Sequence, residues 1–190
     1  MKKLMFCIAL TLGLILQGSY ANAQTLDPSV IKSDPDWQTI ARIEGGFIDK
    51  FVSAKIDLAN FDLNNEKLVL SVIGMTKDEY LKNVDLVRAA ANSLAKKYAI
   101  DPANCPSCKM DNDSKNSTFK TVVAQFRANP DIYTRFRGES LGLDAGTNKT
   151  QSCCGFGFYA CCTVCAFSIE VFPVYLACCA LCHHSQCCSN

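Results

Sequence analysis

The chain has 190 residues, and its 19 Lys and Arg nearly balance its 18 Asp and Glu, which gives a formal net charge of +1. Nucleic-acid binding normally requires clustered positive charge, so this balance argues against a nucleic-acid partner. The length allows one modest domain plus an appendage.

Residues 1–23 have the features of a secretory signal peptide. Two lysines precede an apolar run at residues 4–16, and Ala21-Asn22-Ala23 provides a cleavage site of small residues. We therefore expect a protein that is secreted or resides in the periplasm or cell envelope. Cleavage would remove Cys7 and leave twelve of the thirteen cysteines, whose expected state outside the cytosol is the disulfide.

Residues 24–137 predict a small helical domain, so the fold class is mainly α. Asp34-Pro35-Asp36 has the residue types of a helix start, and Gly45-Gly46 is expected to break that helix. The short apolar run at 68–73 fits a strand or a helical turn, and we take it as helix.

Two more helices follow in this predicted domain. Thr76 and Glu79 form a capping-box pattern before the clearest one, predicted at 77–99. The last is predicted at 117–128, where Asn129-Pro130 ends it, with a short turn around residues 132–136.

Cys105 and Cys108 have the C-x2-C spacing of a redox motif. No βαβ pattern surrounds them, so a local structural disulfide is favoured over a redox site or half of a zinc site. Asp111 and Asp113 resemble the start of a calcium loop, but Asn116 stands where that loop needs glycine, and we discount calcium.

Residues 138–152 are rich in Gly, Ser, Asn, Thr and Asp and are predicted to form a polar linker. Such a segment is a favourable place for a processing protease to cut. The sequence allows two alternatives, release of the segment that follows and its permanent attachment to the domain.

Residues 153–190 form a cysteine-rich tail that holds ten of the thirteen cysteines. Two C-x3-C units lie in predicted helices at 157–170 and 174–184, on either side of Pro173. Antiparallel packing of these helices brings Cys161 opposite Cys182 and Cys165 opposite Cys178, and we predict these two disulfides. The other six tail cysteines have several possible pairings, and they are Cys153, Cys154, Cys162, Cys179, Cys187 and Cys188.

His183 and His184 lie among these cysteines and make zinc or copper binding an alternative to disulfides. Cysteines occur on both arms of the hairpin and histidines on only one, so we favour disulfides and expect no metal or other cofactor. Neither histidine has a nucleophile and a carboxylate arranged around it, so we expect no catalytic residues and no enzyme activity.

The tail is also unusually apolar, with a single charged side chain, Glu170, between residues 153 and 182. Its length would suffice for a membrane span, but Pro173 and the paired cysteines argue against a simple one. A small disulfide-bonded hairpin would leave apolar side chains exposed for a membrane or a protein partner. The candidate contact residues are Phe156, Phe158, Tyr159, Phe167, Phe172, Tyr175 and Leu176.

The order of signal peptide, helical domain and tail with paired cysteines resembles secreted bacteriocin precursors of the fulvocin-related and halocin types. The matching pairs are Cys153-Cys154, Cys161-Cys162, Cys178-Cys179 and Cys187-Cys188. The twin C-x3-C pattern is also similar to that of plant α-hairpinins, although the tail has no Lys or Arg.

The resemblance implies an antimicrobial peptide that acts on a membrane or surface receptor of target cells. It also implies that the upstream domain is a leader or an immunity-like chaperone that masks the tail. The alternatives are an envelope protein whose tail is never released and a Cys/His metal-binding protein.

Overall fold

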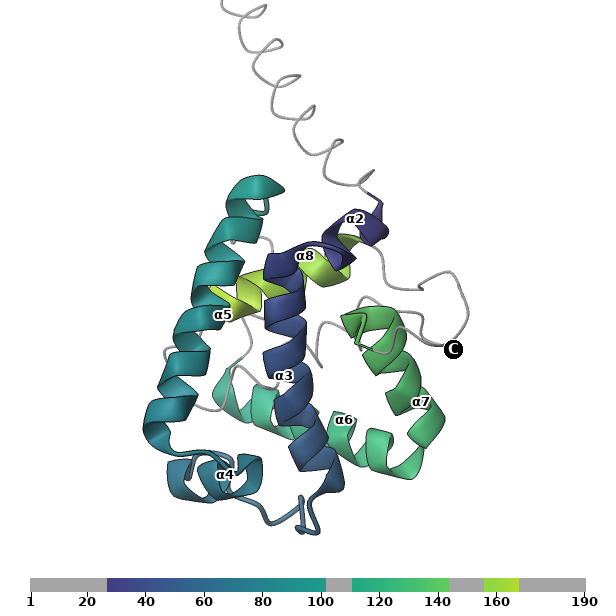
Figure 1. Ribbon diagram of the computed structural model, residues 1–190. Coiled ribbons are helices and arrows are strands. Elements are labelled where there is room, and N and C mark those ends of the chain that lie inside the picture. Colours follow the sequence, from purple (N-terminus) through teal and green to yellow (C-terminus); the bar gives the residue numbers. More distant parts are fainter. Residues whose placement is uncertain (1–26, 102–110, 144–155, 168–190) are drawn as a thin grey trace, which may run out of the picture.

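The computed structural model describes residues 27–101, 111–143 and 156–167 (Figure 1). Within these ranges 77% of the residues are helical and no strand occurs, which confirms the mainly α prediction. The elements are α2 (Pro28–Lys32), α3 (Pro35–Ser53), α4 (Glu66–Ile73), α5 (Lys77–Lys97), α6 (Asn112–Ala128), α7 (Pro130–Arg135), the π-helical turn η3 (Phe136–Leu141) and α8 (Phe156–Phe167).

Helix α3 is the central element of the described fold. It packs against α5 along its length and also contacts α2, α4, α6 and η3. Figure 1 shows α3 and α5 running antiparallel, α4 at one end of the pair and α8 across the other end. The core lies between these helices and includes Trp37, Phe47 and Phe51, each at most 1% exposed.

Local sequence signals account for most helix starts. The carboxylate of Asp34 accepts a hydrogen bond from the Asp36 amide at the start of α3, with Pro35 in the first turn. The capping box of Thr76 and Glu79 is confirmed, because the side chain of each accepts a hydrogen bond from the backbone amide of the other. The helix predicted at 68–73 is confirmed within α4, and its N-cap is Asn65.

Two predictions about element boundaries were wrong. Helix α3 continues through Gly45 and Gly46 without a break, because the glycines keep helical geometry. Helix α6 begins at Asn112, five residues before its predicted start at 117, because Asp111 caps it by accepting from the Ser114 amide. That capping is a structural role for a residue that resembled part of a calcium loop.

Two leucines of the predicted linker at 138–152 pack against the core. Leu141 is fully buried, and Leu143 packs partly buried against the core. The packed domain therefore extends at least to residue 143, since these two leucines supply apolar surface that the core covers. Residues 144–155 lie outside the described ranges.

Candidate functional site

The candidate site is the contact between α8 and the rest of the helical domain. Helix α8 is the described part of the cysteine-rich tail, and it packs against α5 and α2. Its residues Phe158, Tyr159, Cys162 and Thr163 are fully buried. A helix that is apolar on all sides requires cover on more than one face, and the domain provides that cover.

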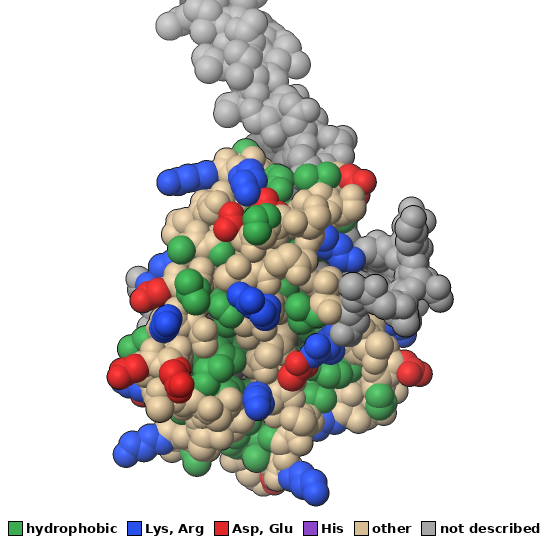
Figure 2. All heavy atoms as spheres, in the orientation of Figure 1, with side chains coloured by type: hydrophobic (Ala, Val, Ile, Leu, Met, Phe, Trp, Pro, Cys, Tyr) green, Lys and Arg blue, Asp and Glu red, His purple; other side chains and the backbone are tan. Residues whose placement is uncertain are grey.

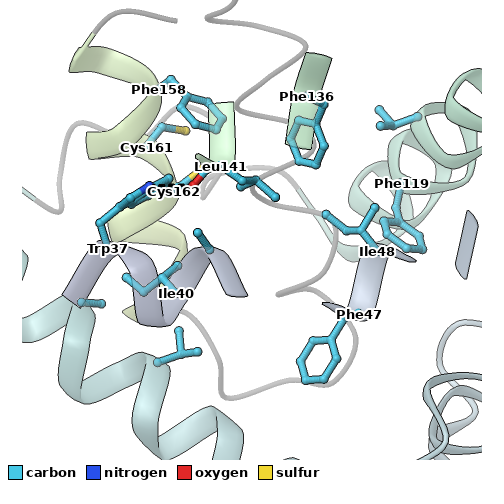
Figure 3. Packing of buried hydrophobic residues seen from close by; sticks show 14 of the residues in the cluster. Trp37, Ile40, Phe47, Ile48, Phe119, Phe136, Leu141, Phe158, Cys161 and Cys162 are labelled. Carbon is cyan, nitrogen blue, oxygen red and sulfur yellow. Dashed lines mark hydrogen bonds between the residues drawn. The ribbon is translucent and has the colours of Figure 1, made fainter. Parts of the chain in front are cut away.

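Trp37 of α3 makes the best-defined contacts with α8 (Figure 3). Its ring lies 4.7 Å from the Tyr159 ring and 6.0 Å from the Phe158 ring, at interplanar angles of 77° and 73°. Edge-to-face arrangements of this kind add stabilisation to the burial of the rings themselves. The indole N–H donates to the Leu141 carbonyl at 3.3 Å, so the only tryptophan of the chain joins α3, η3 and α8.

The described cysteines belong to the same apolar cluster. Cys161 is 5% exposed and Cys162 is fully buried. The predicted partner of Cys161, Cys182, lies outside the described residues, so disulfide bonding of these cysteines stays a prediction. The Thr163 hydroxyl beside them donates to the Tyr159 carbonyl at 2.7 Å, which satisfies this polar group inside the helix.

A glycine in α3 allows Leu141 of η3 and Leu143 to pack closely against that helix. A Cβ atom placed on Gly45 would lie 2.5 Å from Cδ1 of Leu143 and 3.1 Å from Cδ1 of Leu141. Both distances are shorter than ordinary carbon contacts. The two leucines therefore occupy the space that a side chain at position 45 would fill.

A charged cluster fixes the ends of α3 and α5 near α8. The carboxylate of Asp34, 5% exposed, accepts from Lys97 Nζ at 2.7 Å and from the Tyr98 hydroxyl at 2.8 Å. Burial acts to raise the pKa of Asp34, but the hydrogen bonds from Lys97, the Asp36 amide and Tyr98, with the charge of Lys97, outweigh it and lower the pKa. Asp34 is therefore ionised at neutral pH and holds the N-terminus of α3 to the C-terminus of α5.

The structure places only part of the predicted site. Phe158 and Tyr159 were expected in an exposed apolar patch, but they are fully buried because the chain's own domain covers them. Phe156, Cys165 and Phe167 belong to α8, but their side chains are not described. The predicted residues outside the described ranges are Cys105, Cys108, Cys153, Cys154, Phe172, Tyr175, Leu176, Cys178, Cys179, Cys182, His183, His184, Cys187 and Cys188.

Sequence reasoning missed Trp37 as the residue that receives α8. A signal was present, since Trp37 lies on one helical face with Ile40 and Ala41, and all three are fully buried. That spacing indicates a core position. It does not indicate that the residues covering Trp37 come from the far end of the chain.

Two observations apply to residues 27–101, 111–143 and 156–167 alone. No group of three His, Cys, Asp or Glu residues there is arranged to hold a metal ion. No helix there is long and apolar enough to cross a membrane.

No protein-family model matches the chain, and neither a curated protein nor a solved structure matches it. The described fold is that of an all-α domain that encloses the first helix of its own cysteine-rich tail. Any function has to be argued from that enclosure.

Proposed function

We propose that the chain is a secreted precursor whose helical domain covers the apolar start of a disulfide-rich peptide. Once released, this peptide acts on a membrane or a surface receptor of competing cells. The domain thus serves as a carrier that keeps the peptide inactive until release. A protease that cuts after residue 143 would separate the two parts.

The observation that supports this proposal is the complete burial of Phe158 and Tyr159 against Trp37. Aromatic side chains of this size are also those that would insert into a membrane interface or a receptor groove. While α8 is docked, Phe158 and Tyr159 are not exposed to a membrane or to a receptor. The face of the domain seen in Figure 2 carries both positive and negative side chains, which suits a protein that remains in solution during transport.

Masking of this kind is a matter of differential burial. The apolar side chains of α8 lose contact with water in the precursor and would do so again at the target. Release by proteolysis makes this transfer favourable, because the linked domain no longer competes with the target at high effective concentration.

The test begins with intact mass spectrometry of the exported protein, with and without reduction and alkylation. We expect a C-terminal species whose cysteines are all oxidised. The intact chain and the cleaved preparation are then compared for growth inhibition of related bacteria and for binding to liposomes. We expect activity from the cleaved preparation alone, and equal inactivity of both preparations would refute the proposal.

The permanently tethered envelope protein is the second candidate. It is supported by the continuous burial of Leu141 and Phe158 in one cluster, since a permanent core would look the same. An unprocessed chain that stays in the membrane pellet after fractionation would favour it.

The metal-binding alternative has less support, because a disulfide sulfur is not a thiolate ligand and we expect the tail cysteines to form disulfides. It would depend on His183, His184 and cysteines outside the described residues. Stoichiometric zinc in protein purified without chelator would revive it.

A further inference from the structure

We propose that the helical domain is a binding site for α8 that does not require the covalent connection between them. After a cut between residues 143 and 156, α8 stays in its site, and the two fragments form a non-covalent complex. The inference rests on the proposed function for its biological meaning, because it describes the state of the peptide between cleavage and delivery.

The first argument is that α8 is enclosed. Successive residues of a helix point about 100° apart, so a run of neighbouring residues faces every direction around the axis. A helix that lies on a surface keeps one face of such a run in water. Between positions 158 and 164, six residues of α8 are at most 5% exposed, and they are Phe158, Tyr159, Cys161, Cys162, Thr163 and Val164.

The second argument is that the contacts of α8 come from residues before the connection. Helices α5 and α2 pack against α8, and the Trp37 ring of α3 contacts the rings of Tyr159 and Phe158. All of these elements precede Leu143, so a cut after that residue removes none of these contacts. What the cut lowers is the effective concentration of α8 at its site. The contact then becomes an ordinary association equilibrium.

The third argument is the chemistry of the buried side chains. The Thr163 hydroxyl donates to the Tyr159 carbonyl within α8 at 2.7 Å, so its burial needs no partner from the domain. Most of the other buried side chains of α8 are apolar or aromatic. Their association is driven by removal of apolar surface from water, which does not depend on a covalent link.

For the proposed precursor, cleavage therefore permits delivery of the peptide but does not complete it. The peptide leaves when a target buries its aromatic side chains more favourably than the domain does. It also leaves when dilution lowers the concentration of the domain below the dissociation constant of the complex. Until then the domain continues to cover α8.

The experiment inserts the recognition sequence of a site-specific protease after Gly146 of the full chain and cuts the folded, oxidised protein. Gel filtration at about 10 μM shows whether the fragments elute together, and electrophoresis in denaturant without reductant shows whether they are joined covalently. We expect one native peak that contains both fragments, and two bands in denaturant. Two native peaks, or a single band in denaturant, would overturn the proposal.

The dissociation constant is read from the emission of Trp37, the only tryptophan of the chain, as the cut protein is diluted. The emission should shift to longer wavelength as α8 leaves and Trp37 meets water. The uncut chain is the control, and its emission should not depend on concentration because its helix stays linked to the site.

Two variants of the cut chain test whether α8 makes the contact that holds the fragments. Phe158→Ala removes a ring 6.0 Å from that of Trp37 and should raise the dissociation constant about tenfold or more. Phe119→Ala removes the same ring from α6, where Phe119 is 1% exposed and packs 5.1 Å from the Phe51 ring. It should leave the dissociation constant near that of the unsubstituted chain.

Equal weakening by the two variants would show that the α8 contact does not hold the fragments and would overturn the proposal. If either alanine variant lacks the helical circular dichroism of the wild type, Phe158→Leu and Phe119→Leu supply the same comparison. Growth inhibition tests the proposed function, whereas assembly of the cut fragments tests this inference, so each can fail without the other.

Discussion

Gly45 and Gly46 are neighbours in α3 with different surroundings. A Cβ atom on Gly46 would meet nothing within 4 Å, whereas one on Gly45 would meet both leucines that end the packed domain. Glycine costs helix stability at both positions, but only at Gly45 does the missing side chain serve close packing.

This difference predicts opposite results for a matched pair of substitutions. Gly46→Ala should stabilise the chain by about 1 kcal/mol through helix propensity alone. Gly45→Ala should be less stable than Gly46→Ala by about 1–3 kcal/mol, because Leu143 and Leu141 must move to admit the new methyl group. Urea unfolding measures the free energy of unfolding of both variants. Equal increases in this free energy would show that Leu141 and Leu143 do not need the space beside Gly45.

Asp34 gives the fold a defined response to acid. Its pKa is lowered in the folded chain, so its contribution to stability is present above the pKa of the unfolded chain. That contribution is lost as the pH falls through the lowered folded-state value, below the ordinary carboxyl range.

We therefore expect Asp34→Asn to destabilise the chain by about 1 kcal/mol at pH 7, at the lower end for a charged hydrogen bond because Lys97 is half in solvent. The difference should shrink as the pH falls below the ordinary carboxyl range. The control is Asp85→Asn, which removes an exposed ion pair with Arg88 at 3.6 Å and should change little at either pH. A difference for Asp34→Asn that persists at low pH would assign its effect to packing instead of charge.

At the scale of elements, one side chain of α6 completes the end of α3. The Arg127 guanidinium donates to the carbonyls of Phe51 and Ala54 at 2.7 Å, of Ile56 at 3.0 Å and of Val52 at 3.2 Å. The last carbonyls of a helix have no partner within it, and Arg127 supplies one from another element.

Arg127→Lys should therefore destabilise the chain by about 2–4 kcal/mol, because an ammonium group cannot reproduce the planar array of donors. The exposed Arg88→Lys is the control, and we expect it to be nearly neutral. Thermal unfolding compares the two variants, and similar melting temperatures would show that water replaces the guanidinium at the end of α3.

The same elements show how far local sequence patterns predict the fold. The capping box at Thr76 and the Asn129-Pro130 stop were correctly interpreted because their signals lie within four residues. The packing role of Gly45 in α3 was missed because its reason, the close approach of Leu143, lies almost one hundred residues away. The enclosure of α8 was missed for the same reason.

At the scale of the whole molecule, the division into domain, linker and tail described composition better than packing. Residues 138–152 are rich in polar residues and glycine, yet Leu141 is fully buried, and α8 lies near the start of the tail in sequence but in the core in space. Composition reports the average of a segment. Packing depends on single side chains such as Trp37 that meet residues from elsewhere.

Trp37 also determines when this core can form. It donates to the carbonyl of Leu141, 104 positions further along the chain, and its ring meets that of Tyr159 beyond it. Contacts between such distant residues form slowly, because a long loop must close before they contribute. A ribosome or a translocation channel that has delivered only α3 and α5 holds a chain whose central tryptophan is still uncovered. The core can close only after the start of the cysteine-rich tail has emerged. In the proposed precursor, this would couple completion of the carrier to arrival of the segment that it carries.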